Sequence, residues 1–202
     1  MNVFDAIEAR RAIKLFDPEA SIPSPDEQKI LAAARLAPTA FNMQNWRFVV
    51  VRDQAMRRKI RALAWDQPQM TDASLLVVLC ADLMAWEKQP ERYWQHAPDD
   101  FGKQIVQSML NFYQGREDVQ RDEAMRSISL AAMNMMLAAQ ALGYDSCPMD
   151  GFDFAAVGEL IRLPADHIIG MIVTIGRKKA EVWPRGGRLA EDEVIFVDRF
   201  DD

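Results

Sequence analysis

Helical spacing of apolar residues is clearest between about residue 122 and residue 142. The apolar positions there alternate between separations of four and three residues: Ile128, Ala132, Met135, Ala139 and Leu142. Gly143 follows directly, and glycine is the residue type that most often ends a helix. The pattern therefore predicts the longest helix of the chain, ending at Gly143.

Shorter helices are predicted from their start signals. Ser24 offers a capping hydroxyl, Pro25 suits the first helical position, and Glu27 is placed to close a capping box. This helix is expected to continue until Pro38 stops it. Capping side chains predict three more helices: from Asn2 to about Arg10, from Asp53 to about Leu63, and from Asp153 to Leu163.

Apolar and β-branched runs predict four strands, at residues 46–52, 75–81, 168–175 and 194–197. The run at 75–81 is apolar throughout, which is typical of a strand buried on both faces. Helices alternate with isolated strands, and the chain contains no repeat and no low-complexity linker. The pattern predicts an α/β or α+β sandwich that forms one domain over residues 1–202.

Residues 84–118 interrupt this alternation. They are rich in Trp, Gln and charged residues and are broken by Pro90 and Pro98, which predicts short helices that leave the core. Their aromatic residues suit either a pocket wall or a subunit surface, and we favour the pocket wall.

Two other segments are predicted to be loops with accessible backbone N–H groups. Residues 38–45 are rich in amide side chains, and residues 147–153 combine small residues with a glycine. Such loops can hydrogen-bond the heteroatom edge of a planar ring. Asp150 and Gly151 are equally typical of a plain turn.

Composition narrows the class of protein. The 202 residues are 50% hydrophobic and carry a net charge of −6, which excludes a disordered chain and argues against nucleic acid or an anionic membrane as partner. The apolar runs are too short to span a bilayer, and the N-terminus is unlike a signal peptide. Two isolated cysteines without metal-ligand spacing are expected to be buried thiols, so the expected location is the cytoplasm and no metal site is predicted.

Positive charge is concentrated near the two ends of this acidic chain. Residues 1–16 have a net charge of +1 and residues 177–188 a net charge of +4. Two such islands are either solvated loops or the two halves of a site for one phosphate, which the planar arginine fork suits. Glycine-rich nucleotide loops, nucleophile elbows and zinc motifs are absent from the sequence, and the two histidines are expected to be structural or exposed.

Four blocks, in this order, resemble the nitroreductase family of flavin-dependent oxidoreductases. They are RRAIKLF at 10–16, ARLAPTAFNMQNWRF at 34–48, AAQALG at 138–143 followed by 146–153, and IG at 175–176 with PRGGRL at 184–189. The resemblance implies an α+β fold, a three-layer sandwich whose central mixed or antiparallel sheet is flanked by helices. It also implies an intertwined homodimer with one FMN at each of two interface sites, and it places residues 84–118 near the active site.

The same resemblance assigns roles to individual residues. Arg10 and Arg11, together with Arg185 and Arg188, are expected to hold the FMN phosphate. Lys14 is expected to reach the pyrimidine edge of the flavin, where positive charge stabilises the reduced ring.

Further contacts are implied on both sides of the subunit interface. The partner subunit is expected to supply Pro38, Thr39, Ala40 and Asn42. The flavin edge around N5 and O4 is expected to meet Pro148, Met149, Asp150 and Gly151, through the backbone of 149–151. Polar contacts to the pyrimidine or ribityl part are expected from Asp66, Gln67 and Gln69.

Two positions depart from the family pattern. Ala12 stands where the family often has a serine that contacts the phosphate, so the arginines must compensate, although the Ala12 backbone stays in the expected site. Asn45 replaces a usual proline, which loosens the expected loop.

The implied activity is transfer of hydride from NAD(P)H to flavin N5, and then of two electrons to a nitroaromatic, a quinone or a similar small aromatic acceptor, in two separate steps. This needs little protein acid–base chemistry, which fits a chain with two histidines. One alternative is a specialised flavoprotein of the same fold, such as a reductive dehalogenase-like enzyme or a dehydrogenase. The other is a non-catalytic module that binds a phosphorylated ligand.

Overall fold

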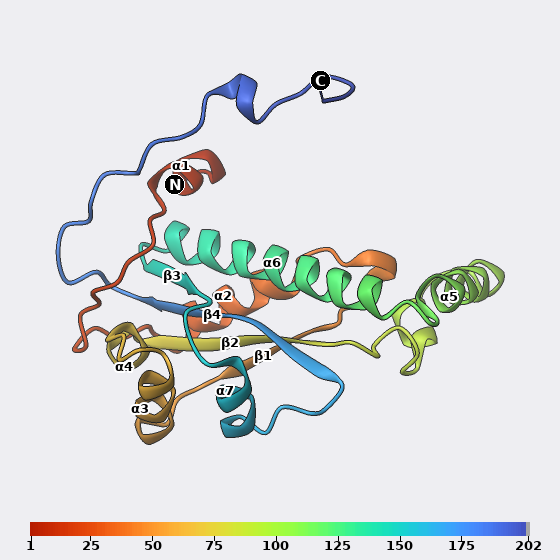
Figure 1. Ribbon diagram of the computed structural model, residues 1–202, viewed down its shortest axis with the longest axis horizontal. Coiled ribbons are helices and arrows are strands. Elements are labelled where there is room, and N and C mark those ends of the chain that lie inside the picture. Colours follow the sequence, from red (N-terminus) through yellow and green to blue (C-terminus); the bar gives the residue numbers. More distant parts are fainter. Residues whose placement is uncertain (201–202) are drawn as a thin grey trace.

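A four-stranded antiparallel sheet forms the centre of the molecule, with helices on both faces (Figure 1). The computed structural model describes residues 1–200. The strand order is β1-β2-β4-β3, where the strands are β1 Trp46–Val50, β2 Leu75–Asp82, β3 Asp145–Met149 and β4 His167–Gly176. This arrangement confirms the predicted α+β three-layer sandwich and specifies that the sheet is antiparallel.

One face of the sheet is covered by α2 (Ser24–Arg35) and α6 (Glu117–Ala141). Along β2, alternate residues Leu75, Val77 and Leu79 join a buried cluster with side chains of these two helices. Gly143 has a left-handed backbone with φ of 83° directly after α6, so the predicted helix end is confirmed.

The opposite face is covered by α3 (Gln54–Leu63), the short α4 (Gln69–Asp72) and α7 (Phe154–Leu160). The other residues of β2, including Leu76 and Val78, pack here. Every residue of β2 is buried, so the prediction of a strand covered on both faces is confirmed. The predicted caps Asp53 and Asp153 both accept backbone hydrogen bonds at the starts of α3 and α7.

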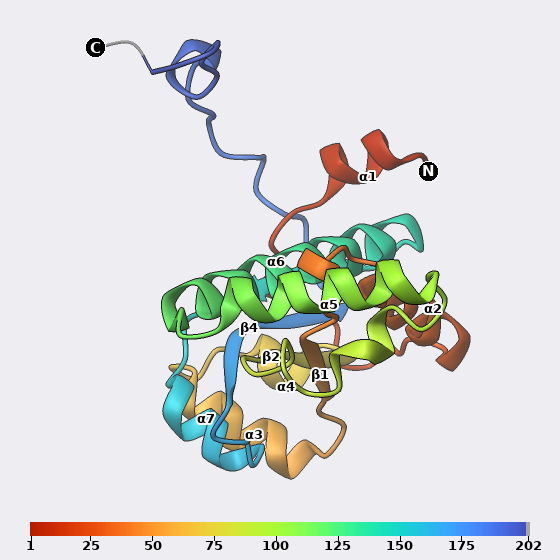
Figure 2. The ribbon, with the colours of Figure 1, turned by 90° about the vertical axis from the view of Figure 1, so that its right-hand side faces the viewer.

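The excursion after β2 contains a short 3-10 turn, η2 (Pro90–Tyr93), and α5 (Asp99–Tyr113) (Figure 2). We predicted several short helices, but α5 is one continuous helix of 15 residues. A small core of its own, including Trp86, Met109 and Tyr113, holds it together.

The two ends of the chain come together beside strand β3. Helix α1 (Val3–Ala9) leads into an extended segment in which Ala12 bridges Ser146 of β3 and Phe16 bridges Lys178. After β4 the chain turns past this segment and continues as an exposed tail to residue 200, interrupted by the turn η3 (Glu191–Glu193). Both views show the tail running away from the layers (Figures 1 and 2).

Three predicted element boundaries were wrong. Helix α2 begins at Ser24, so its cap position is Pro23, which has no side-chain acceptor to cap the helix, and the Glu27 carboxylate pairs with Arg52. Helix α6 begins at Glu117, five residues before the predicted start. Residues 69–72, for which no helix was predicted, form α4.

Two predicted strand assignments were also wrong. Residues 194–197 form no strand: they follow η3 in the exposed tail. Conversely, the end of β3 lies in the segment 147–153, which was predicted to be a loop because it combines small residues with a glycine. Proline is tolerated there because β3 is at the edge of the sheet, where one side of the strand needs no ladder partner.

Among the described residues, no helix is both long and apolar enough to cross a membrane.

Candidate active site

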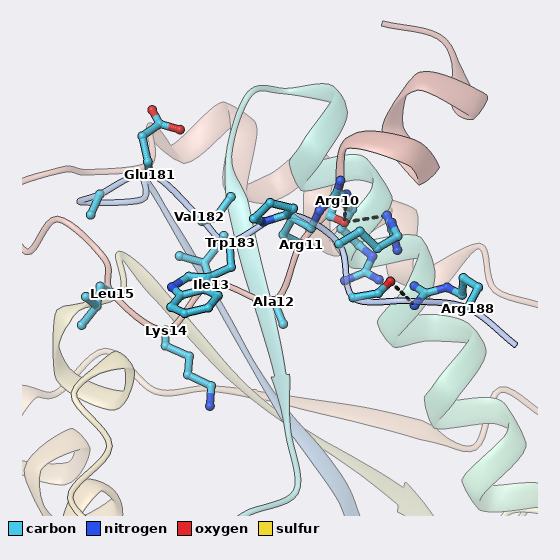
Figure 3. A pocket seen from close by; sticks show the side chains of 14 residues that line it. Arg10, Arg11, Ala12, Ile13, Lys14, Leu15, Glu181, Val182, Trp183 and Arg188 are labelled. Carbon is cyan, nitrogen blue, oxygen red and sulfur yellow. Dashed lines mark hydrogen bonds between the residues drawn. The ribbon is translucent and has the colours of Figure 1, made fainter.

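A basic cavity of about 620 Å³ lies where the two chain ends meet (Figure 3). One wall is residues 10–15 and the other is the start of the tail, residues 180–188. The first wall is fixed to the sheet, since the Ile13 N–H donates to the Ser146 carbonyl at 3.0 Å. The second is fixed to the first, since the Lys179 N–H donates to the Leu15 carbonyl at 3.0 Å.

Arg185 joins the two basic islands directly. Its Nη2 atom lies 3.0 Å from the backbone carbonyl oxygens of Ile7, Glu8 and Arg10. These carbonyls lie at the C-terminal end of α1, where backbone acceptors are unsatisfied and attract a cation. Arg185 is therefore held against Arg10, although the two residues are 175 positions apart in the sequence.

Positive charge in this cavity is only weakly compensated. Arg11 also donates to backbone carbonyls at the end of α1, and Arg188 donates to the carbonyls of the neighbouring glycines. Partial desolvation, followed by repulsion from Arg11, Arg188 and Arg10, lowers the pKa of the Arg185 guanidinium. Four arginines that repel one another around a cavity form a site for an anion, and their forks suit a phosphate.

Lys14 lines the same cavity and extends away from the arginines (Figure 3). Burial raises the pKa of the Cys147 thiol, while the charges of Lys14 and Arg10 oppose that shift, so both cations lie near β3. Within residues 1–200 the Lys14 ammonium has no hydrogen-bond or ion-pair partner. It can therefore interact with a second group of a ligand whose phosphate is held by the arginines.

Gly151 and Gln67 contact each other but are not among the residues that line the basic cavity. The Gln67 side-chain amide donates to the Gly151 carbonyl at 3.0 Å, and the buried Gln69 amide donates to Gln67 at 3.1 Å. The structure thus brings these three expected site residues together. Asp66 is turned away and pairs with Arg61 at 2.7 Å.

Trp65 is a site neighbour that the sequence analysis missed. Trp65 and Asp66 both have left-handed backbones, with φ of 51° and 54°, an uncommon conformation for two successive non-glycine residues. The indole lies against Gly151 so closely that a Cβ atom there would be 2.6 Å from Cζ3 of the ring. It is nevertheless 76% exposed, so one face of this large aromatic ring is open beside the Gly151 backbone.

The remaining expected site residues do not line the basic cavity. Met149 is buried in the core, Pro148 is half-buried, and Asp150 lines a different cavity. The loop with Pro38, Thr39, Ala40 and Asn42 lies towards the α5 end of the molecule, away from the basic cavity (Figure 1). There its Asn42 amide donates to the Tyr93 carbonyl, and the Trp94 indole donates to the Phe41 carbonyl.

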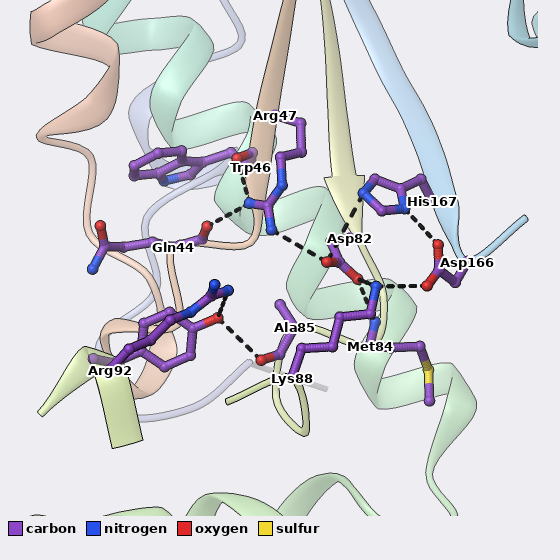
Figure 4. A network of polar contacts seen from close by, with 11 residues as sticks. Gln44, Trp46, Arg47, Asp82, Met84, Ala85, Lys88, Arg92, Asp166 and His167 are labelled. Atoms are coloured by element: carbon purple, nitrogen blue, oxygen red, sulfur yellow. Dashed lines mark hydrogen bonds and ion pairs between the residues drawn. The ribbon is translucent and has the colours of Figure 1, made fainter. Parts of the chain in front are cut away.

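A polar network lies at the end of the sheet where β2 finishes and β4 begins (Figure 4). The buried Asp82 carboxylate accepts from Arg47 at 3.2 Å and from Lys88 at 2.8 Å. Lys88 also binds Asp166, which in turn contacts His167. Asp82, Asp166 and His167 are spaced as metal ligands could be, but the Lys88 ammonium occupies the cation position between the two carboxylates.

Comparison with known proteins identifies the family. Residues 7–177 match the sequence profile described as the nitroreductase family. The chain belongs to the nitroreductase family. Protein DrgA from Synechocystis is 51% identical over 178 residues, which cover 88% of this chain and 85% of DrgA. MhqN of Bacillus subtilis, whose name proposes an NAD(P)H nitroreductase activity, is 33% identical over 94% of this chain and 95% of its own.

Solved nitroreductase structures share the fold. A protein from Exiguobacterium sibiricum, solved in complex with FMN, is 25% identical to this nitroreductase-family chain and superposes with a TM-score of 0.90. The match covers 98% of each chain. The family assignment confirms the resemblance that the four sequence blocks indicated.

Proposed function

We propose that this nitroreductase-family protein is an FMN-dependent oxidoreductase that uses NAD(P)H to reduce a nitroaromatic, a quinone or a similar small acceptor. The observation that carries the proposal is the convergence of Arg10, Arg11 and Arg185 around one cavity, with Arg188 beside them. Their hydrogen bonds go to backbone carbonyls, so their charge is available for the dianionic phosphate of FMN. Bound FMN supplies a flavin ring that accepts hydride and returns two electrons.

The chain's own residues would bind and orient this cofactor. The arginines hold the phosphate, and Lys14 on the same cavity places a positive charge at the pyrimidine edge. The Gln67 amide fixes the Gly151 carbonyl, so the backbone at residues 149–151 can present its N–H groups to the ring edge. No residue needs to act as an acid or base, because the protein mainly positions the two reactants.

A homodimer is part of the proposal. The side chains of Val3, Phe4 and Ile7 on α1 are each half exposed or more and form an apolar face, and the tail exposes more apolar residues. A second copy of the chain would cover these surfaces. In that dimer the loop with Pro38, Thr39, Ala40 and Asn42 would meet the partner's flavin, and the excursion bonded to it at Tyr93 and Trp94 would lie near the same site.

The visible spectrum of the purified protein tests the proposal. We expect a flavin absorption band that NAD(P)H bleaches anaerobically and that an added quinone restores. Arg185→Ala is expected to weaken FMN binding about tenfold or more, since it removes a charge-assisted phosphate contact. Arg58→Gln, an exposed arginine on α3, is the matched control and should retain FMN.

A colourless protein that FMN cannot reconstitute would overturn the proposal and favour the non-catalytic phosphate-binding alternative. A yellow protein that rejects nitroaromatics and quinones would favour the specialised flavoprotein. The two free, buried cysteines fit the reducing cytoplasm, where we expect the protein to act.

A further inference from the structure

Gln69 is a buried amide on α4, with only 1% of its surface exposed. Burying an amide costs free energy unless hydrogen bonds replace its bonds to water, and an apolar residue avoids that cost. The neighbouring Met70 is fully buried in the apolar cluster on this face of the sheet. The burial of Gln69 therefore points to a role other than stability of the fold. A side chain with so little open surface acts on a ligand through its neighbours.

Three hydrogen bonds lead from Gln69 to Gly151, all in the same direction. The Gln69 amide donates to Oε1 of Gln67 at 3.1 Å, and the Gln67 amide donates to the Gly151 carbonyl at 3.0 Å. The peptide group that contains this carbonyl donates through the Phe152 N–H to the Asp150 carbonyl at 3.0 Å. That carbonyl belongs to the peptide group whose N–H is the Gly151 N–H. We call these four amide groups, two side chains and two peptides, the amide chain.

The direction of the amide chain is fixed by the backbone. The Gly151 carbonyl can only accept, so Gln67 must turn its NH₂ group towards it and its oxygen away. That oxygen can also only accept, so Gln69 must donate to it. Within residues 1–200 the Gly151 N–H has no acceptor. The amide chain therefore ends in a free donor.

Four amide dipoles that point the same way add up, as they do along a helix. Each hydrogen bond polarises the next amide, so the last N–H is a stronger donor than an isolated peptide N–H. Here the last N–H is that of Gly151, whose backbone lies beside the open face of the Trp65 indole. The amide chain thus presents a partial positive charge at this position.

Strand β3 connects this position to the basic cavity. Ala12 bridges Ser146 in the parallel sense, so the segment that begins at the arginines runs alongside β3 in the same direction. This register places Lys14 beside Pro148. Gly151 follows three residues later, roughly 10 Å further at the rise of a strand. A ligand whose phosphate binds the arginines and whose body extends past Lys14 would therefore reach the end of the amide chain.

We propose that Gln69 and Gln67 are positioning residues for the flavin, because the amide chain holds the Gly151 N–H at the N5–O4 edge of the ring and strengthens it as a donor. Negative charge on the ring grows when the ring is reduced, so a stronger donor at this edge stabilises the reduced state more than the oxidised state. The inference deepens the proposed function, on which it rests. It gives Gln69 a role that requires no contact between Gln69 and the cofactor.

The midpoint potential of the bound flavin tests the proposal, because it compares the binding of the two oxidation states. We expect Gln69→Met to weaken binding of reduced flavin about threefold more than binding of oxidised flavin, which lowers the potential by about 15 mV for a two-electron couple. Gln67→Met also removes the bond to the Gly151 carbonyl. Its effect should be about tenfold, or about 30 mV.

The double variant distinguishes positioning from direct contact. Because Gln69 acts only through Gln67, the variant that combines Gln67→Met and Gln69→Met should have the potential of Gln67→Met alone. A further fall in potential would show that Gln69 contacts the cofactor itself, and would overturn the inference.

Gln120→Met is the matched control. Gln120 is also buried, and its side-chain amide also donates to a backbone carbonyl, that of Tyr113 at 2.8 Å, but it lies on α6 outside the amide chain. Its replacement removes the same kind of hydrogen bond and should lower stability. The flavin potential should stay at the wild-type value.

A nuclear magnetic resonance measurement supplies a readout without flavin. In the FMN-free full-length protein, the Phe152 amide proton should move upfield in Gln69→Met and further in Gln67→Met, because its bond to the Asp150 carbonyl is less polarised. Gln120→Met should leave this resonance in place. A Phe152 resonance that does not respond to either variant would refute the amide chain.

The two proposals fail in different ways. A protein that binds FMN with the same potential in the wild type, Gln69→Met and Gln67→Met refutes the role of the amide chain and leaves the proposed function intact. A protein that binds no flavin refutes the proposed function, and this inference with it.

Discussion

Gly151 has no room for a side chain, because the Trp65 indole lies against its α-carbon. Adding a methyl group would force the indole to rotate away or the backbone to shift. No strong sequence signal predicts this contact. Trp65 lies between a helix and a loop, and Gly151 is typical of a turn. Their contact follows from the packing of α3 and α4 beside the end of β3.

We therefore expect Gly151→Ala to lower the free energy of unfolding by about 1 kcal/mol, the low end of the cost of overpacking, because the exposed indole can rotate away. Trp65→Ala should recover most of this loss when the two changes are combined, because it removes the group that clashes. Urea unfolding of both single variants and the double variant measures the coupling. Strictly additive costs would show that the clash does not control the effect.

Lys14 is a residue whose position could be predicted and for which we propose a partner outside the chain. Its ammonium lines the basic cavity without a partner among the described residues. We expect Lys14→Ala to slow flavin reduction by NAD(P)H more than it weakens FMN retention, because in the proposed function the arginines hold the phosphate while Lys14 stabilises the reduced ring. Stopped-flow absorbance and equilibrium dialysis measure the two effects, and an unchanged reduction rate removes Lys14 from the mechanism.

The basic residues of the site could be identified from sequence because charge islands and family motifs are local properties. What could not be read from sequence is that Arg185 reaches the end of α1. That contact depends on the tail turning past residues 10–17 at the edge of β3.

At the scale of elements, the ion network ties the end of β2 to the start of β4 and to the turn before α5. Asp82 is buried and accepts from both Arg47 and Lys88, so removing its charge leaves cations without a partner. We expect Asp82→Asn to lower the free energy of unfolding by about 3 kcal/mol, as breaking a buried pair does. Asp166→Asn, at a more exposed position, should cost about 1 kcal/mol or less. Denaturant unfolding measures both costs, and equal losses would contradict the ranking.

The pH dependence of this network follows from two shifted groups. Hydrogen bonds from Lys88 and then His167 lower the pKa of Asp166 to about 2 from 3.8. Although burial opposes its charge, hydrogen bonds to Asp166 and Asp82 raise the pKa of Lys88 above 10.5. The contribution of Asp166 is thus complete above about pH 4 and is lost as the pH falls towards 2. The contribution of Lys88 to stability is complete below the pKa of Lys88 in the unfolded chain. It is lost only as the pH rises above that value.

The difference in stability between wild type and Asp166→Asn should therefore stay constant from about pH 5 to pH 9 and shrink below pH 4. Thermal unfolding of both proteins across this range measures it. A difference that grows as the pH falls from 5 to 3 would contradict the assigned direction of the Asp166 shift.

Elements were predictable where a short-range signal decides them. The apolar run of β2 and the caps Asp53 and Asp153 located their elements correctly. The prediction was wrong where the local signal did not decide the structure: α2 starts one residue early, with Pro23 at its cap, and an edge position lets Pro148 join a strand.

At the scale of the whole molecule, one subunit does not bring the expected partner loop to its own basic cavity, and it leaves the apolar side chains of α1 open. Phe4 is 77% exposed and Ile7 is 50% exposed, although they lie on the helix that anchors Arg185. Burial of each such side chain is worth about 1.5–3 kcal/mol, and a two-fold dimer counts each one twice. A substitution that removes these apolar side chains should therefore weaken subunit association and cofactor binding together.

We expect the wild type to sediment as the proposed dimer, and the double variant Phe4→Ser, Ile7→Ser to sediment as a monomer at the same concentration and to bind FMN more weakly although the arginines are intact. The helical circular dichroism signal should be close to that of the wild type, because these side chains contribute little to the subunit core. Adding FMN in excess should shift the variant back towards dimer, since a ligand bound across the interface favours the assembled state. A wild-type monomer that retains stoichiometric FMN would separate the cofactor site from the interface and refute this coupling.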